Sequence, residues 1–147
     1  MYKRVLIPLD GSAMAEQALP HAVAQARHFH AELILLRVVE PFAHARGMSL
    51  ADLEQIRQQT RIWVDEYLER IAADIQQEGV SVRKVTIDGR PHTGIAEFAE
   101  NNEVDLIVMS TRGQSGLSRW LMGSVADRVV RGANVPVQLV RTRKEET

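Results

Sequence analysis

Five short apolar runs, separated by segments with helical periodicity, constrain the fold of this 147-residue chain most strongly. The runs occupy residues 4–9, 33–39, 80–87, 104–109 and 135–140. Nearly continuous apolar strands are typical of a parallel sheet covered on both faces. Strands that alternate with helices therefore predict an open α/β fold with right-handed crossovers. The third run alternates in character, which predicts a peripheral strand.

Four helices are expected between these strands. In the first, alanines and other apolar residues recur from Ala15 to Ala26, and Pro20 interrupts them, so we expect a bend there or a later helix start. Ser49 with Asp52 forms a capping box that opens a long helix, and Pro91 suits the first turn of the third helix. The long helix should bury one apolar stripe until Gly79 stops it, composed of Leu53, Ile56, Trp63, Tyr67, Ile71 and Ile75.

The bulk properties exclude several classes of protein. A formal net charge of −1 gives no basic surplus for a nucleic acid, and the absence of cysteine excludes disulfides and thiol chemistry. No apolar run reaches the roughly 18 residues of a membrane span, and the start of the chain carries no signal-peptide core. We expect one cytoplasmic domain over residues 1–141, followed by a charged tail at 142–147.

Residues 110–124 connect the fourth strand to the last helix, whose Val125, Val129 and Val130 share one face. Glycine lets a backbone approach a ligand closely, and a helix N-terminus offers free N–H groups to phosphate. Ser124 is expected to cap this helix, with Asp127 completing a capping box. The segment therefore predicts an anion site formed by Arg112, Ser124 and the backbone of Gly113 and Gly123.

This stretch resembles the nucleotide-binding motif G-x2-G-x9-G-[ST] of the universal stress proteins. Gly113, nine intervening residues and then Gly123 and Ser124 match it, whereas Ser110 replaces the first glycine. If Ser110 had to adopt a positive φ, the strain would cost about 1–2 kcal/mol. One charge-assisted hydrogen bond to a ligand contributes about as much, so this strain alone would not prevent nucleotide binding. The likeness extends to the first and last strands.

The resemblance implies a strand order of 3-2-1-4-5, with helices on both faces, which places the ends of strands one and four side by side. Ligands bind outside the carboxyl ends of strands at such a switch point. By resemblance, the strand end Pro8, Leu9 and Asp10 contacts the adenosine part of a nucleotide, and the backbone at Val38 reads adenine. The phosphates would lie over Gly113, Gly123 and Ser124. The remaining nucleotide-binding residues would be Met109, Ser110, Arg112 and Val125.

Other catalytic signatures are missing from the sequence. It has no G-x4-G-K-[ST], no G-x-G-x-x-G after the first strand, no G-x-S-x-G and no H-E-x-x-H. The resemblance implies an ATP-binding regulatory protein, with AMP or ADP as further possible ligands and Mg²⁺ as the expected metal. Since these catalytic signatures are missing, we expect at most slow hydrolysis. The alternatives are a nucleotide-independent interaction module of the same fold and, third, a true enzyme on it.

The last strand also predicts an interface. An apolar edge strand invites pairing, and universal stress proteins commonly dimerise through this element. We therefore expect a homodimer in which the strand from Val135 to Val140 lies antiparallel to its mate.

Overall fold

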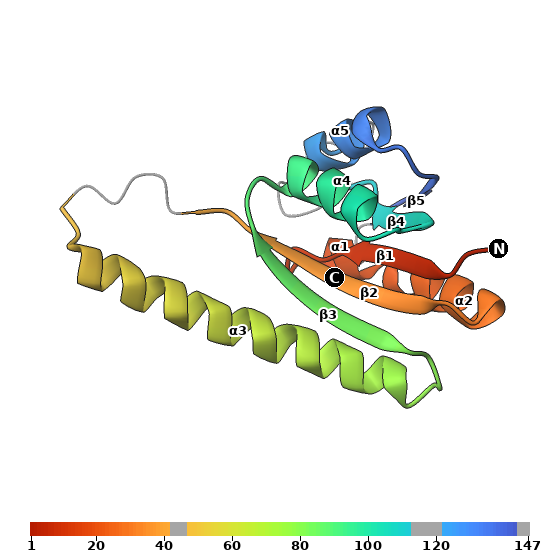
Figure 1. The fold of residues 1–147 in the computed structure, drawn as a ribbon, viewed down its shortest axis with the longest axis horizontal. Coiled ribbons are helices and arrows are strands. Elements are labelled where there is room, and N and C mark those ends of the chain that lie inside the picture. The colour runs from red at the N-terminus through yellow and green to blue at the C-terminus, as the bar shows by residue number, and fades with distance from the viewer. Residues whose placement is uncertain (42–46, 113–121, 144–147) are drawn as a thin grey trace.

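The computed structural model describes residues 1–41, 47–112 and 122–143. Five parallel strands form one sheet in the order β3-β2-β1-β4-β5, which confirms the expected fold (Figure 1). The elements follow one another as β1 (Arg4–Pro8), α1 (Ala13–Glu16), α2 (Leu19–Phe29), β2 (Glu32–Val39), α3 (Leu50–Gln76), β3 (Val82–Asp88), α4 (Pro91–Asn101), β4 (Leu106–Ser110), α5 (Ser124–Gly132) and β5 (Val137–Val140).

Two apolar cores lie on the two faces of the sheet. On one face, side chains of α1, α2 and α3 pack against alternate residues of the central strands, including Val5 and Leu33. On the other face, α4 and α5 cover the intervening residues, including Leu6 and Ile34. This alternation follows from the strand period of two residues. Helices therefore cover both faces, as the continuous apolar strands predict.

The first helical segment is broken, as Pro20 predicts. α1 ends at Glu16, and α2 begins at Leu19 with the proline in its first turn, where the missing N–H costs no helical hydrogen bond. The described part of the chain thus contains two helices where the sequence predicted one bent helix or a late start.

The long helix α3 begins as expected, because the Ser49 hydroxyl accepts a hydrogen bond from the backbone N–H of Asp52. Its buried side chains begin only at Val64, because its N-terminal half extends past the carboxyl ends of the strands (Figure 1). The prediction that Trp63 belongs to the buried stripe is wrong. Trp63 is 66% exposed, and Val64 and Leu68 face the sheet instead.

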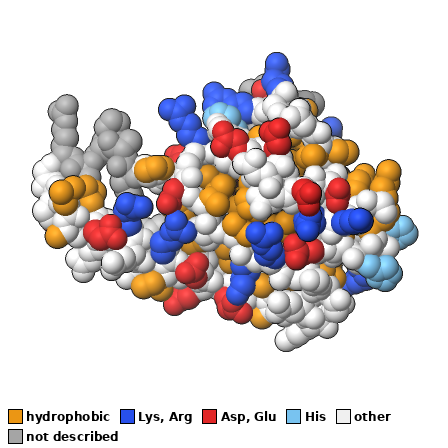
Figure 2. Space-filling view, in the orientation of Figure 1, with side chains coloured by type: hydrophobic (Ala, Val, Ile, Leu, Met, Phe, Trp, Pro, Cys, Tyr) orange, Lys and Arg blue, Asp and Glu red, His pale blue; other side chains and the backbone are white. Residues whose placement is uncertain are grey.

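Charged side chains of both signs are interleaved over the face shown in Figure 2. That face carries no continuous basic patch, in keeping with the formal net charge of −1. None of the described helices is long and apolar enough to cross a membrane.

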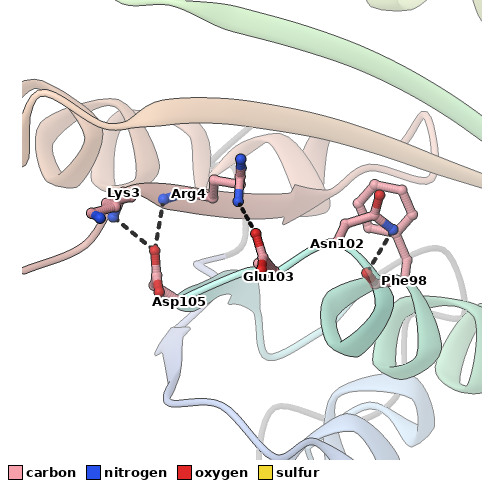
Figure 3. A network of polar contacts seen from close by, with 6 residues as sticks. All are labelled: Lys3, Arg4, Phe98, Asn102, Glu103 and Asp105. Carbon is pink, nitrogen blue, oxygen red and sulfur yellow. Dashed lines mark hydrogen bonds and ion pairs between the residues drawn. The ribbon is translucent and has the colours of Figure 1, made fainter.

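A polar network fixes the amino ends of β1 and β4. One carboxylate oxygen of Asp105 accepts the backbone N–H groups of Lys3 at 2.7 Å and Arg4 at 2.9 Å, and the Arg4 guanidinium pairs with Glu103 (Figure 3). At the other end of the chain, Arg143 exchanges two hydrogen bonds with the Gln17 side chain. Residues 144–147 of the expected tail lie outside the described residues.

Candidate functional site

A cavity of about 410 Å³ opens at the carboxyl ends of the strands, at the point where the strand order reverses between β1 and β4. Its volume falls within the range of sites for small molecules. The cavity is lined by Pro8, Leu9, Asp10, Ala15, Leu36, Arg37, Val38, Val39, Glu40, Thr60, Pro91, Ile95, Met109, Ser110, Thr111, Arg112, Gly123, Ser124, Val125 and Ala126.

Every predicted site residue that the structure describes lies in this lining, although some are separated by more than a hundred positions in the sequence. Gly113 lies outside the described residues, so the structure gives no geometry for it. The sequence alone missed Arg37 and Thr60, as well as Pro91 and Ile95 of α4. Of these four residues, only Arg37 has a sequence feature that could have indicated a site, because it is a charged residue near the end of an apolar strand.

Asp10 holds the turn that follows β1. Its Oδ1 accepts hydrogen bonds from the backbone N–H of Ser12 at 2.9 Å and from the Ser12 hydroxyl at 2.6 Å. Ser12 in turn caps α1 by accepting the N–H of Ala15 at 3.1 Å, and Gly11 between them has a φ of +88°. Asp10 therefore forms the turn and also belongs to the lining of the cavity.

The N-terminus of α5 faces the cavity, but its cap differs from the prediction. Gly123, not Ser124, is the N-cap residue, and Ser124 is already the first helical residue, so no capping box forms. The N–H of Gly123 donates to the Thr111 carbonyl at 2.6 Å. The amides free for a ligand are therefore those of the first turn, Ser124, Val125 and Ala126, which have no partner within the helix.

Ser110 does not adopt the positive φ that a glycine would favour, so the strain considered for this position does not arise. It is the last residue of β4, and its side chain is buried. Its hydroxyl donates to the Met14 carbonyl at 2.7 Å, with the Ala15 carbonyl at 3.2 Å. Ser110 thus joins β4 to α1 behind the cavity wall.

The opposite part of the cavity is apolar. Val38 and Leu36 of β2, Ile95 of α4 and Met109 of β4 all belong to or pack on the core beneath α4. Gly94 allows α4 to come close here, because a Cβ on Gly94 would lie 3.1 Å from a methyl carbon of Val38. A flat aromatic group would be desolvated between such side chains.

The polar groups of the cavity carry both charges. Asp10 and Glu40 contribute carboxylates, and Arg37 and Arg112 contribute guanidinium groups. Within residues 1–41, 47–112 and 122–143, no group of three or more His, Cys, Asp or Glu side chains could hold a metal ion.

Comparisons with known proteins agree with this architecture. Residues 1–141 match the model of the Universal stress protein family. Universal stress protein MJ0531 of Methanocaldococcus jannaschii is 36% identical over 146 residues, covering 99% of this chain and 86% of the relative. The solved structure of MJ0577, a universal stress protein of the same organism, superimposes with a TM-score of 0.85 at 30% identity over 99% of both chains.

A family member from Arabidopsis thaliana, solved with AMP bound, has a TM-score of 0.72 at 20% identity and covers 99% of this chain and 95% of its own. At that identity the likeness establishes the shared fold. The family match over residues 1–141 and the identity to MJ0531 establish the relationship itself. The chain is therefore a member of the universal stress protein family.

Proposed function

We propose that this chain binds an adenine nucleotide, ATP in the first instance, in the cavity at the carboxyl ends of β1 and β4. The observation that carries the proposal is that free helix N-terminal amides and an apolar wall open into the same cavity. A nucleotide needs both features, one for its phosphates and one for its base. The protein would act as a cytoplasmic regulatory protein whose nucleotide occupancy tunes conformation or partner binding.

The base would lie against Val38 and Met109, with the backbone of β2 reading its edge, and the ribose would lie near Asp10. The phosphates would accept hydrogen bonds from the amides of Ser124 and Val125 and pair with Arg112. Micromolar affinity requires only about −8 kcal/mol. A desolvated base and a few charge-assisted hydrogen bonds of about 1.5–3 kcal/mol each are sufficient. The AMP complex of the Arabidopsis relative supports the ligand class.

Mg²⁺ is expected to enter with the nucleotide. This ion keeps several waters and is usually bound by one or two carboxylates together with phosphate oxygens. Asp10 and Glu40 are the carboxylates in the lining, which suits that mode and not a cage made only of protein groups. The ion would neutralise phosphate charge. The described lining contains no histidine to act as a general base, so hydrolysis is expected to be slow at most.

Isothermal titration of the intact protein with Mg·ATP tests the proposal, with Gly123→Val as the principal variant. Gly123 has a φ of −58°, which any residue can adopt, so the branched side chain obstructs the phosphate approach without backbone strain. We expect an affinity loss of at least about tenfold, equivalent to about 1.4 kcal/mol. Gly123→Ala is the matched control and should lose less.

Two results would contradict the proposal. Unchanged ATP affinity in Gly123→Val would show that the phosphates bind elsewhere. If wild-type protein gave neither heat nor a thermal shift at millimolar Mg·ATP, the alternative of a nucleotide-independent interaction module would be favoured. The replacement of the first motif glycine by Ser110 is the observation that keeps this alternative open.

We also propose that the protein is a homodimer through β5, as the last strand predicts. β5 lies at one edge of the sheet, and Leu139 on it is 36% exposed. An edge strand presents unpaired backbone groups to a second copy. Light scattering should give the mass of two chains at micromolar concentration and that of one chain for Leu139→Lys. A wild-type monomer would refute the interface.

A further inference from the structure

Arg37 occupies a special place at the cavity. It is a charged residue in an otherwise apolar stretch of β2, between Leu36 and Val38, which face the α4 side of the sheet. Since strand side chains alternate, Arg37 faces the opposite side, towards α1 and α3. Its Nη1 would lie 2.9 Å from a Cβ on Gly11, so the guanidinium lies directly against the turn formed by Asp10, Gly11 and Ser12.

No hydrogen bond or ion pair joins this guanidinium to another described residue. Its Nε is buried without a hydrogen bond, and none of the ion pairs between described residues includes Arg37. A partly desolvated charge is costly unless an opposite charge pairs with it. Arg37 therefore has hydrogen-bond donors available for a ligand.

Other polar and charged groups lie near the Arg37 guanidinium. The Tyr67 hydroxyl on α3 is also buried, and the Glu16 carboxylate lies near enough to act on it as an acceptor, although the two do not meet normal hydrogen-bond geometry. Burial raises the pKa of Tyr67, the Glu16 and Asp10 carboxylates raise it further, and Arg37 lowers it, so these three charged groups surround the hydroxyl. No ion pair between described residues joins Arg37 to either of these carboxylates.

The two arginines of the cavity come from strands that are not neighbours in the sheet. Arg37 belongs to β2, whereas Arg112 follows β4, and β1 lies between these two strands. Neighbouring strands are about 4.8 Å apart, so the two strands are separated by roughly 10 Å. A 5′-phosphate chain held by α5 and Arg112 would lie on the β4 side of β1, whereas Arg37 comes from the β2 side. Arginines from the two sides of β1 suit a ligand with a second anionic group apart from its 5′-phosphates.

We propose that Arg37 binds a second phosphate on the ribose, so that the preferred ligand is a purine nucleotide phosphorylated on its 2′ or 3′ hydroxyl as well as on its 5′ carbon. The inference rests on the proposed function, which puts the ribose beside Asp10, and the Asp10 turn is what the guanidinium touches. Arginine pairs with phosphate through two parallel hydrogen bonds. An arginine near the ribose is also how dinucleotide-binding folds accommodate a 2′-phosphate.

Isothermal titration with three probes of equal phosphate number tests the proposal: ADP, adenosine 2′,5′-bisphosphate and adenosine 3′,5′-bisphosphate. One bisphosphate should bind the wild-type protein about tenfold more tightly than ADP, and the better probe identifies the phosphorylated hydroxyl. In Arg37→Gln the bisphosphate and ADP should bind with about equal affinity, and Arg37→Lys should retain part of the preference for the bisphosphate. Arg57→Gln removes a positive charge outside the lining, on an exposed side chain, and should keep the full preference.

The outcomes separate this inference from the proposed function. Binding of ADP with no preference for either bisphosphate would refute the role of Arg37 while nucleotide binding stands. A preference that survives in Arg37→Gln, or that disappears in Arg57→Gln, would also refute it. Absence of binding for all three probes would refute both proposals. Thermal unfolding of each variant, measured in parallel, checks that every variant is folded at the temperature of the titration.

Discussion

Replacing Ser110 by glycine restores the complete family motif, and the structure predicts that it weakens the protein. The hydroxyl donates to Met14 and Ala15 carbonyls that also accept the N–H groups of Gln17 and Ala18, both at 3.2 Å. Because these acceptors keep one donor each, losing the hydroxyl should cost only about 1 kcal/mol. Glycine in a strand adds about 0.5–1 kcal/mol through backbone entropy. The free energy of unfolding should therefore fall by about 1.5–2 kcal/mol.

Urea unfolding followed by circular dichroism measures this loss by linear extrapolation. Ser110→Ala isolates the hydroxyl and should lose about 1 kcal/mol, leaving the remainder to the glycine backbone. In a chain of this size, Ser110→Gly should melt about 3–8 °C lower than wild type. Equal or higher stability of Ser110→Gly would refute the reasoning, because it would mean that the position favours glycine and that the bond to α1 contributes nothing.

Three further predictions concern stability. Asp105→Ala removes the acceptor of two backbone N–H groups and should lower the free energy of unfolding by about 1–3 kcal/mol in urea titrations, with Asp105→Asn losing less. The pKa of Tyr67 is raised from 10.0, chiefly by burial, so the unfolded state loses this proton at a lower pH than the folded state. The free energy of unfolding should therefore fall as the pH rises above 10, and thermal melts at pH 9 to 11 should show a smaller fall for Tyr67→Phe. Gly79→Ala, at a φ of +83°, should cost about 1–2 kcal/mol, whereas Gly132→Ala, with open space in α5, should gain about 0.5–1 kcal/mol; equal effects by calorimetry would contradict the backbone argument.

Much of the fold follows from period and length alone. Apolar runs fix the strands, and Pro20 and Ser49 fix where two helices begin, because their effects are local. Trp63 was misassigned because periodicity shows which residues share a face but not how far the sheet extends beneath it. α3 extends past the strands, so the apolar period continues to Trp63, which lies 66% exposed beyond them.

The residues that line the cavity were predictable where the motif or the family resemblance marks them. Gly123 and Ser124 were found by their spacing, yet which of them caps α5 depends on how the chain enters the helix, and that geometry leaves no pattern in the sequence. Arg37 and Thr60 reach the cavity through sheet order and helix placement, which are properties of the whole fold. The role of Ser110 was missed because its acceptors lie on α1, 95 and 96 positions away.

A crystal structure of the protein with Mg·ATP tests the central claim most directly. The account predicts the phosphates within hydrogen-bond distance of the Ser124 and Val125 amides and the base between Val38 and Met109. Nucleotide bound at another surface, or density for protein side chains filling the cavity at the N-terminus of α5, would contradict it.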